Sequence, residues 1–188
     1  MRRQAILLLV AMAAAMIVAG GVAYAAAVTC DGTGDQDPDP LQCQGTNEAD
    51  TITGTQDPDK IKALAGDDEI SGNSGNDEIY GDEGSDSVDA FSGNDTVYGG
   101  PDGDQSLQGA EDSDKVYGGG GNDNIDAAVN NTDGSVDRSS GGGGNDFINA
   151  VDLDKDIINC GKGKADEVRF DEGIDTIKNC EQKTAVVP

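Results

Sequence analysis

The sequence predicts an all-β fold, a parallel β-solenoid of about thirteen nine-residue units with two units in each coil. Three observations support this prediction. Aspartate recurs every nine residues, an aliphatic residue follows each aspartate at a fixed distance, and glycine is concentrated between them. The 188 residues include 28 Gly and carry a formal net charge of −25. Such a composition would ordinarily indicate disorder, so the prediction depends on the repeat.

The composition excludes several classes of function. The chain contains no His, so it cannot form a serine–histidine triad or an HExxH zinc site. It has 37 Asp and Glu against 12 Lys and Arg, and this excess of negative charge disfavours nucleic acid and anionic membranes as partners.

Residues 1–25 are expected to be a secretory signal peptide. Arg2 and Arg3 precede an apolar run, and small residues lead to a cleavage site after Ala25. A retained membrane anchor is the alternative, but cleavage would leave no membrane span. We therefore expect a secreted protein, in the extracellular medium or at the cell surface.

The repeat begins near residue 45 and continues to residue 180. An aliphatic residue stands two positions after each aspartate of the grid, with one exception: Leu107 comes three positions after Asp104. Glycine commonly stands two positions before the aspartate. The aspartates of this grid are Asp50, Asp59, Asp68, Asp77, Asp86, Asp95, Asp104, Asp114, Asp123, Asp146, Asp156, Asp166 and Asp175.

One apolar side chain per nine residues cannot stabilise a fold unless the units stack. Gly, Asn and Asp favour a tight turn, and the remaining residues can form a short strand with one inward side chain. With two units per coil, residues 18 apart lie on neighbouring rungs, so Asp50, Asp68 and Asp86 stack along one edge. Carboxylates about 4.8 Å apart repel each other unless a cation lies between them. Calcium fits best, because it accepts carboxylate and carbonyl oxygens in tolerant geometry.

Units such as GNSGNDEIY, GGGGNDNID and GGGGNDFIN match the pattern G-G-x-G-x-D-x-U-x, in which U is a large apolar residue. The segment 45–180 therefore resembles the hemolysin-type calcium-binding nonapeptides of the repeats-in-toxin (RTX) family, and the chain is similar to short secreted calcium-binding proteins of actinobacteria. The resemblance implies a parallel β-roll that binds several calcium ions.

The resemblance also implies a set of calcium ligands, in which the motif aspartate is completed by turn carbonyls. The best matches are Asp68, Asp77, Asp86, Asp95, Asp123 and Asp146, followed by Asp104 and Asp114, which have an aspartate in place of the motif glycine two positions earlier. Weaker candidates are Asp50, Asp59, Asp156 and Asp166, in turns that depart further from the motif, and Asp175 near the end of the repeat.

Residues 127–140 interrupt the repeat and are expected to form an inserted loop. Tyr80, Tyr98 and Tyr117 are 18 and 19 residues apart on the outward side of the strands. We expect them to pack across neighbouring rungs, with a carbohydrate platform as the alternative.

The two ends are expected to carry disulfides. Cys160 and Cys180 are one coil apart, and Cys30 and Cys43 would close a small loop within an acidic linker, residues 26–44. A four-cysteine zinc site is disfavoured because no CxxC spacing is present. Residues 181–188 are expected to be a C-terminal tail.

The expected function is that of a secreted calcium-binding β-roll whose folding and rigidity depend on extracellular calcium. It would serve as a structural, surface or adhesion module, with calcium and an extracellular polysaccharide or protein as partners, and it is not expected to be an enzyme. Two alternatives stay open: a calcium-dependent polysaccharide-active enzyme or accessory module, and a disordered acidic calcium buffer.

Overall fold

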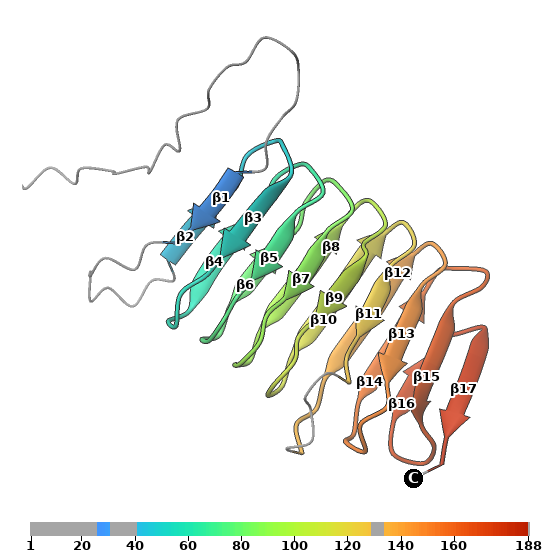
Figure 1. Cartoon of the computed structure of the whole chain (residues 1–188). Coiled ribbons are helices and arrows are strands. Elements are labelled where there is room, and N and C mark those ends of the chain that lie inside the picture. The colour runs from blue at the N-terminus through green and yellow to red at the C-terminus, as the bar shows by residue number, and fades with distance from the viewer. Residues whose placement is uncertain (1–25, 31–40, 129–133, 188) are drawn as a thin grey trace, which may run out of the picture.

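The computed structural model describes residues 26–30, 41–128 and 134–187 as two stacked parallel sheets, with no helix in these segments. Successive strands alternate between the sheets, so the chain winds as a solenoid from β1 and β2 to β16 and β17 (Figure 1). The all-β parallel β-solenoid predicted from the repeat is therefore confirmed.

The nine-stranded sheet contains β1 (Ala26–Thr29), β3 (Asp50–Thr53), β5 (Glu69–Ser71), β7 (Ser87–Asp89), β9 (Ser106–Gln108), β11 (Asn124–Asp126), β13 (Phe147–Ala150), β15 (Glu167–Asp171) and β17 (Gln182–Val186). The eight-stranded sheet contains β2 (Leu41–Gln44), β4 (Asp59–Lys62), β6 (Glu78–Tyr80), β8 (Thr96–Gly100), β10 (Lys115–Gly120), β12 (Arg138–Gly143), β14 (Ile157–Gly161) and β16 (Thr176–Lys178).

The core is a thin double row of aliphatic side chains between the sheets. Ile70 pairs with Val88 in one sheet, Ile79 pairs with Val97 in the other, and all four side chains are buried. Because neighbouring residues of a strand face opposite sides, the three-residue strands bury their middle side chain, only partly in β16, and leave their flanking residues facing outward.

The roll extends beyond the boundaries expected from the motif. Strands β1 and β2 lie in the expected linker and pair with β3 and β4, while β17 lies in the expected tail and pairs with β15. Both expected disulfides are present, Cys30–Cys43 and Cys160–Cys180, with Cα atoms 5.3 and 5.0 Å apart. The end strands need no motif turn of their own, because the open edge of a sheet is a template for pairing.

The expected inserted loop, residues 127–140, is shorter in the structure. Strand β12 begins at Arg138 and pairs with both β10 and β14, so residues 138–140 belong to the roll. Ser139 takes the inward position of an aliphatic residue and is 4% exposed. The spacing from Asp137 to Asp146 is nine, so the repeat resumes at Asp137, earlier than the motif suggested.

The expected signal peptide, residues 1–25, lies outside the described residues, as do residues 31–40 of the expected linker. Within the segments that the structure describes, no helix is long and apolar enough to cross a membrane.

Candidate metal centre

The aspartates of the grid form two ladders, one along each row of turns that leads into a sheet. The register places residues of neighbouring rungs in line, as the 18-residue spacing predicted. The first ladder contains Asp50, Asp68, Asp86, Asp104, Asp123, Asp146 and Asp166, and the second contains Asp59, Asp77, Asp95, Asp114, Asp137, Asp156 and Asp175. All of these side chains except that of Asp175 are buried.

One hydrogen bond repeats along both ladders. Except for Asp166 and Asp175, which end the two ladders, each aspartate donates its backbone N–H to Oδ1 of the aspartate on the next rung, as from Asp77 to Asp95 at 2.7 Å and from Asp86 to Asp104 at 3.0 Å. The remaining bonds of this kind lie between 2.7 and 3.0 Å. These bonds hold each carboxylate in a fixed orientation within its turn.

The second carboxylate oxygen divides the turns into two kinds. In nine turns, which we call open turns, the buried Oδ2 accepts no hydrogen bond from the described residues. The open turns end at Asp68, Asp77, Asp86, Asp95, Asp104, Asp114, Asp123, Asp146 and Asp156. Burying a carboxylate oxygen without a partner is costly, so each open turn leaves a position for a cation. The eight aspartates that the sequence motif ranked as the strongest ligand candidates all stand in open turns.

The first two turns of the roll, residues 46–50 and 55–59, are closed by threonine, and we call them threonine turns. Asp50 Oδ2 accepts hydrogen bonds from the N–H of Thr46 at 2.6 Å and from its hydroxyl at 2.9 Å. Thr55 binds Asp59 Oδ2 in the same way, at 2.6 and 3.0 Å. Oδ1 of Asp59, at the start of its ladder, is buried without a hydrogen bond. In both threonine turns, the protein itself supplies donors to the oxygen that open turns leave free.

Backbone conformation explains this difference. The residue four positions before the aspartate has a positive φ in eight of the nine open turns, including Asn73 at 77°, Phe91 at 73° and Ala110 at 77°; the exception is the turn of Asp156. Thr46 and Thr55 hold the same position but do not have a positive φ. The peptide groups therefore turn differently, and this N–H points toward the carboxylate in the threonine turns and in the turn of Asp175, where Asp171 also lacks a positive φ.

A carbonyl oxygen also lies close to Oδ2 in the two threonine turns and in five open turns, those of Asp77, Asp86, Asp104, Asp123 and Asp146. A Cβ added to Gly72 would lie 2.6 Å from Oδ2 of Asp77 and 2.7 Å from the carbonyl oxygen of Ala90 on the next rung. The two oxygens thus face one small space that any side chain at position 72 would fill. Carboxylate and carbonyl oxygens are the donors that calcium prefers.

Burial raises the pKa values of the open-turn carboxylates. The pKa is about 6 for Asp77 and Asp86, about 7 for Asp95, and about 8 for Asp114 and Asp156. Desolvation is the main cause; the N–H of the preceding rung opposes it, and repulsion from neighbouring carboxylates adds to it. A bound cation would counteract both desolvation and repulsion.

The donor set fits a hard, oxygen-binding cation. Within the described residues, no three acidic or cysteine side chains converge on one metal position, so a bound ion would need backbone carbonyls as well as carboxylates. All four cysteines are in disulfides and the chain has no histidine, which leaves no soft ligand for a transition metal.

Four of the weaker candidates lack an unpartnered Oδ2. Besides Asp50 and Asp59, these are Asp166, whose Oδ2 accepts the N–H of Gly163 at 3.1 Å, and Asp175, whose Oδ2 accepts the N–H of Asp171 at 2.8 Å. Asp156, the fifth weaker candidate, stands in an open turn.

The motif did not predict two buried aspartates. Asp137 completes the second ladder, and its spacing of nine to Asp146 could have identified it. Asp171 accepts the N–H groups of Asp152 and Leu153 at 3.0 and 2.7 Å. It lies off the nine-residue grid, so the sequence held no comparable signal for it.

The comparisons with known proteins agree with this geometry. The model of the RTX calcium-binding nonapeptide repeat matches four times, over residues 44–79, 71–105, 102–132 and 131–150. No curated protein matches the chain. The matched segments cover more than half of the sequence, and they contain the two ladders from Asp50 to Asp146. The chain therefore belongs to the RTX calcium-binding nonapeptide repeat family, and its repeats bind calcium ions.

Proposed function

We propose that this chain is a secreted structural module whose rigid roll forms when calcium fills the open turns. The observation that carries the proposal is the set of nine buried Oδ2 atoms without a hydrogen bond. The proposed ligands are the aspartates of the open turns together with turn carbonyls. The threonine turns, at Asp50 and Asp59, are proposed to hold no calcium of their own.

Calcium would couple to folding through the charge of the chain. At −25, the calcium-free chain repels itself, and the stacked carboxylates add buried negative charge. An ion that binds only the folded roll stabilises it by mass action, by about 1.4 kcal/mol per site at ten times the dissociation constant. Sites on adjoining rungs share turns, so the transition should be cooperative.

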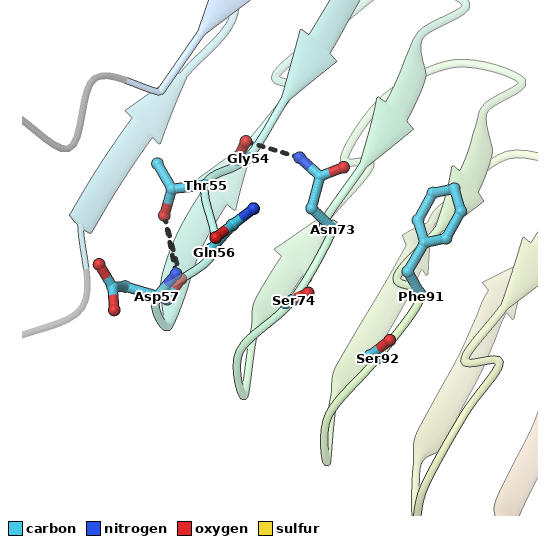
Figure 2. Close-up of a pocket in the computed structure, with 8 residues that line it drawn as sticks. All are labelled: Gly54, Thr55, Gln56, Asp57, Asn73, Ser74, Phe91 and Ser92. Carbon is cyan, nitrogen blue, oxygen red and sulfur yellow. Dashed lines mark hydrogen bonds between the residues drawn. The ribbon is translucent and has the colours of Figure 1, made fainter.

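A catalytic role has less support. A depression of about 690 Å³ lies along one edge of the roll. Figure 2 shows the residues that line it, which are Gly54, Thr55, Gln56, Asp57, Asn73, Ser74, Phe91 and Ser92. Asp57 is the one carboxylate in this lining, whereas hydrolysis of a glycosidic bond ordinarily uses a pair. The Asn73 side chain donates to the Gly54 carbonyl at 2.8 Å, which ties the neighbouring turns together.

A calcium titration tests the proposal. Circular dichroism of the chain without residues 1–25 should show little β structure in chelator and a cooperative gain as calcium rises, with magnesium much less effective. Calorimetry should give several ions per chain. Binding without a gain of β structure would support the disordered buffer instead, and a full β spectrum in chelator would contradict the dependence on calcium.

A further inference from the structure

The outer face of the eight-stranded sheet concentrates the positive charge of this acidic chain. Its outward side chains stand on either side of the buried middle residues, such as Ile61 and Val116. We call this surface the basic face, and it includes Lys60, Lys62, Glu78, Tyr80, Tyr98, Lys115, Tyr117, Arg138 and Lys178. Register links these residues across the sheet, with Lys115 paired to Arg138 and Tyr80 to Tyr98.

The opposite sheet has the reverse charge. Its outward positions carry four acids and one arginine: Glu69, Asp89, Asp126, Glu167 and Arg169. The basic face carries five cations and one acid, Glu78. The Glu78 carboxylate already accepts hydrogen bonds from Lys60 and Tyr80. Lys115 and Arg138 are exposed and form no ion pair within the described residues.

Three tyrosines form a stack in the middle of the basic face, which confirms the expected packing across rungs. The rings of Tyr80 and Tyr98 are 4.8 Å apart and those of Tyr98 and Tyr117 are 5.2 Å apart, all nearly parallel. The ammonium groups of Lys60 and Lys62 lie 5.2 and 5.3 Å from the Tyr80 ring. The stack ends at Tyr117, which is 36% exposed and pairs with the small Ser140 on the next strand.

The surroundings of the basic face favour a thin partner over a broad one. The turns along both edges carry exposed acids, including Asp67, Glu83, Glu111 and Asp112. A planar anionic membrane or a nucleic acid duplex would meet these acids as well as the cations. A single extended chain with one carboxylate per few sugar rings could follow the cations between the two acidic edges. Its hydroxyl groups and ring faces would find partners at the tyrosine edges and at the end of the stack near Tyr117.

We propose that the basic face binds an extended acidic polysaccharide, with Lys115 and Arg138 contacting its carboxylates and Tyr117 contacting a neighbouring sugar ring. The surface requires a folded roll but does not use the open turns, so it is separate from the calcium sites. Its electrostatic contacts are exposed, and salt should weaken them.

The test measures binding of hyaluronate, a soluble polysaccharide with one carboxylate per two sugar rings, to the folded protein at one fixed calcium concentration and low salt. The key variant is Lys115→Ser with Arg138→Ser, and its charge-matched control is Lys164→Ser with Arg169→Ser, which removes one lysine and one arginine outside the basic face. The key variant should bind about tenfold more weakly, as expected for two exposed charge contacts, and the control should bind like the parent. Tyr117→Ser should produce a smaller loss.

Circular dichroism in calcium verifies that each variant is folded, so that a loss of binding is distinguished from a failure of calcium-dependent folding. Neutral dextran, phosphatidylglycerol vesicles and duplex DNA serve as competing ligands. Equal losses in the key and control variants, or dextran binding as tight as hyaluronate binding, would overturn the proposal. Tighter binding to vesicles or DNA would overturn the choice of partner.

Discussion

The threonine turns and the open turns place the same aspartate in the same ladder but complete its carboxylate differently. In the open turns, Oδ1 accepts an N–H from the preceding rung, as Asp68 does from Asp50 at 2.7 Å, whereas Asp50 and Asp59 stand at the start of their ladders. In the threonine turns, Oδ2 receives an amide and a hydroxyl from Thr46 or Thr55. In the open turns, Oδ2 is buried without a hydrogen bond. In both threonine turns and in eight of the nine open turns, the conformation of the residue four positions before the aspartate therefore distinguishes an Oδ2 that has protein donors from one that has none.

The largest expected effect concerns all the open turns together and appears as a pH dependence of the calcium-free chain. Seven of their aspartates have folded-state pKa values of about 6 to 8, above the ordinary aspartate pKa of about 4, and burial raises the pKa of Asp68 and Asp146 as well. Protonation therefore favours the roll. This stabilisation is complete below the unfolded-state pKa and is lost as pH rises through 6 to 8. In chelator, the β structure measured by circular dichroism should therefore increase as the pH is lowered from 8 to 5.

Saturating calcium should reverse this dependence, because calcium binds the ionised carboxylates and protons compete with it. The same measurement in calcium should show a roll that is stable at pH 8 and weaker at pH 5. If acid also destabilised the calcium-free chain between pH 8 and pH 5, the open-turn carboxylates could not have the raised pKa values that burial gives them.

A single-site comparison has a smaller expected effect. Asp95→Asn keeps a carbonyl oxygen that can accept the Asp77 N–H but removes the charge from an open turn. In calcium it should lower the number of bound ions and reduce the unfolding free energy by about 1.4 kcal/mol or more at ten times the dissociation constant. In chelator it should be at least as stable as the parent, because a buried, repelled charge is gone.

Asp50→Asn is the matched change in a threonine turn and should leave the number of bound calcium ions unchanged. Calorimetry and urea unfolding, each with and without calcium, measure both variants. Equal losses of bound calcium in the two variants would show that threonine does not replace the ion.

The repeat period predicted the ladders because each step of 18 residues advances the chain by one rung, which fixes the stacking of Asp68, Asp86 and Asp104. It also brought Cys160 next to Cys180. The pairing of β1, β2 and β17 could not be predicted in the same way, since these end strands lack the motif. Asp137 was missed because Ser139 replaces the aliphatic marker of its strand. The division into open and threonine turns depends on backbone φ and on side-chain donors, and the aspartate spacing contains neither.

The basic face could not be predicted from the sequence for a different reason. Each cation was visible in the sequence, but its grouping required the register of strands far apart in the chain, such as β4 and β12. The five extra residues between Asp123 and Asp137, compared with one repeat, shift the later strands relative to a strict nine-residue count. Arg138 therefore joins Lys115 only when Asp137 is recognised as a ladder residue.

The smallest expected effect concerns the backbone position that distinguishes the two kinds of turn. Phe91 has a φ of 73° and is 42% exposed, so replacing it removes little core packing. Phe91→Ala keeps a Cβ in a conformation that disfavours one, whereas Phe91→Gly relieves that strain. The glycine variant should therefore be more stable than the alanine variant by about 1 kcal/mol in urea unfolding.

At Thr55 the alanine variant, rather than the glycine variant, should be the more stable of the two. Both substitutions remove the hydroxyl that binds Asp59 Oδ2, but the backbone φ there is not positive, so glycine only adds freedom to the unfolded chain. Thr55→Ala should therefore be more stable than Thr55→Gly by about 0.5 to 1 kcal/mol. The same order of Ala and Gly at both positions would mean that backbone conformation does not separate the two kinds of turn. The inverted order would link the positive φ at this position to the unpartnered Oδ2 of the open turns.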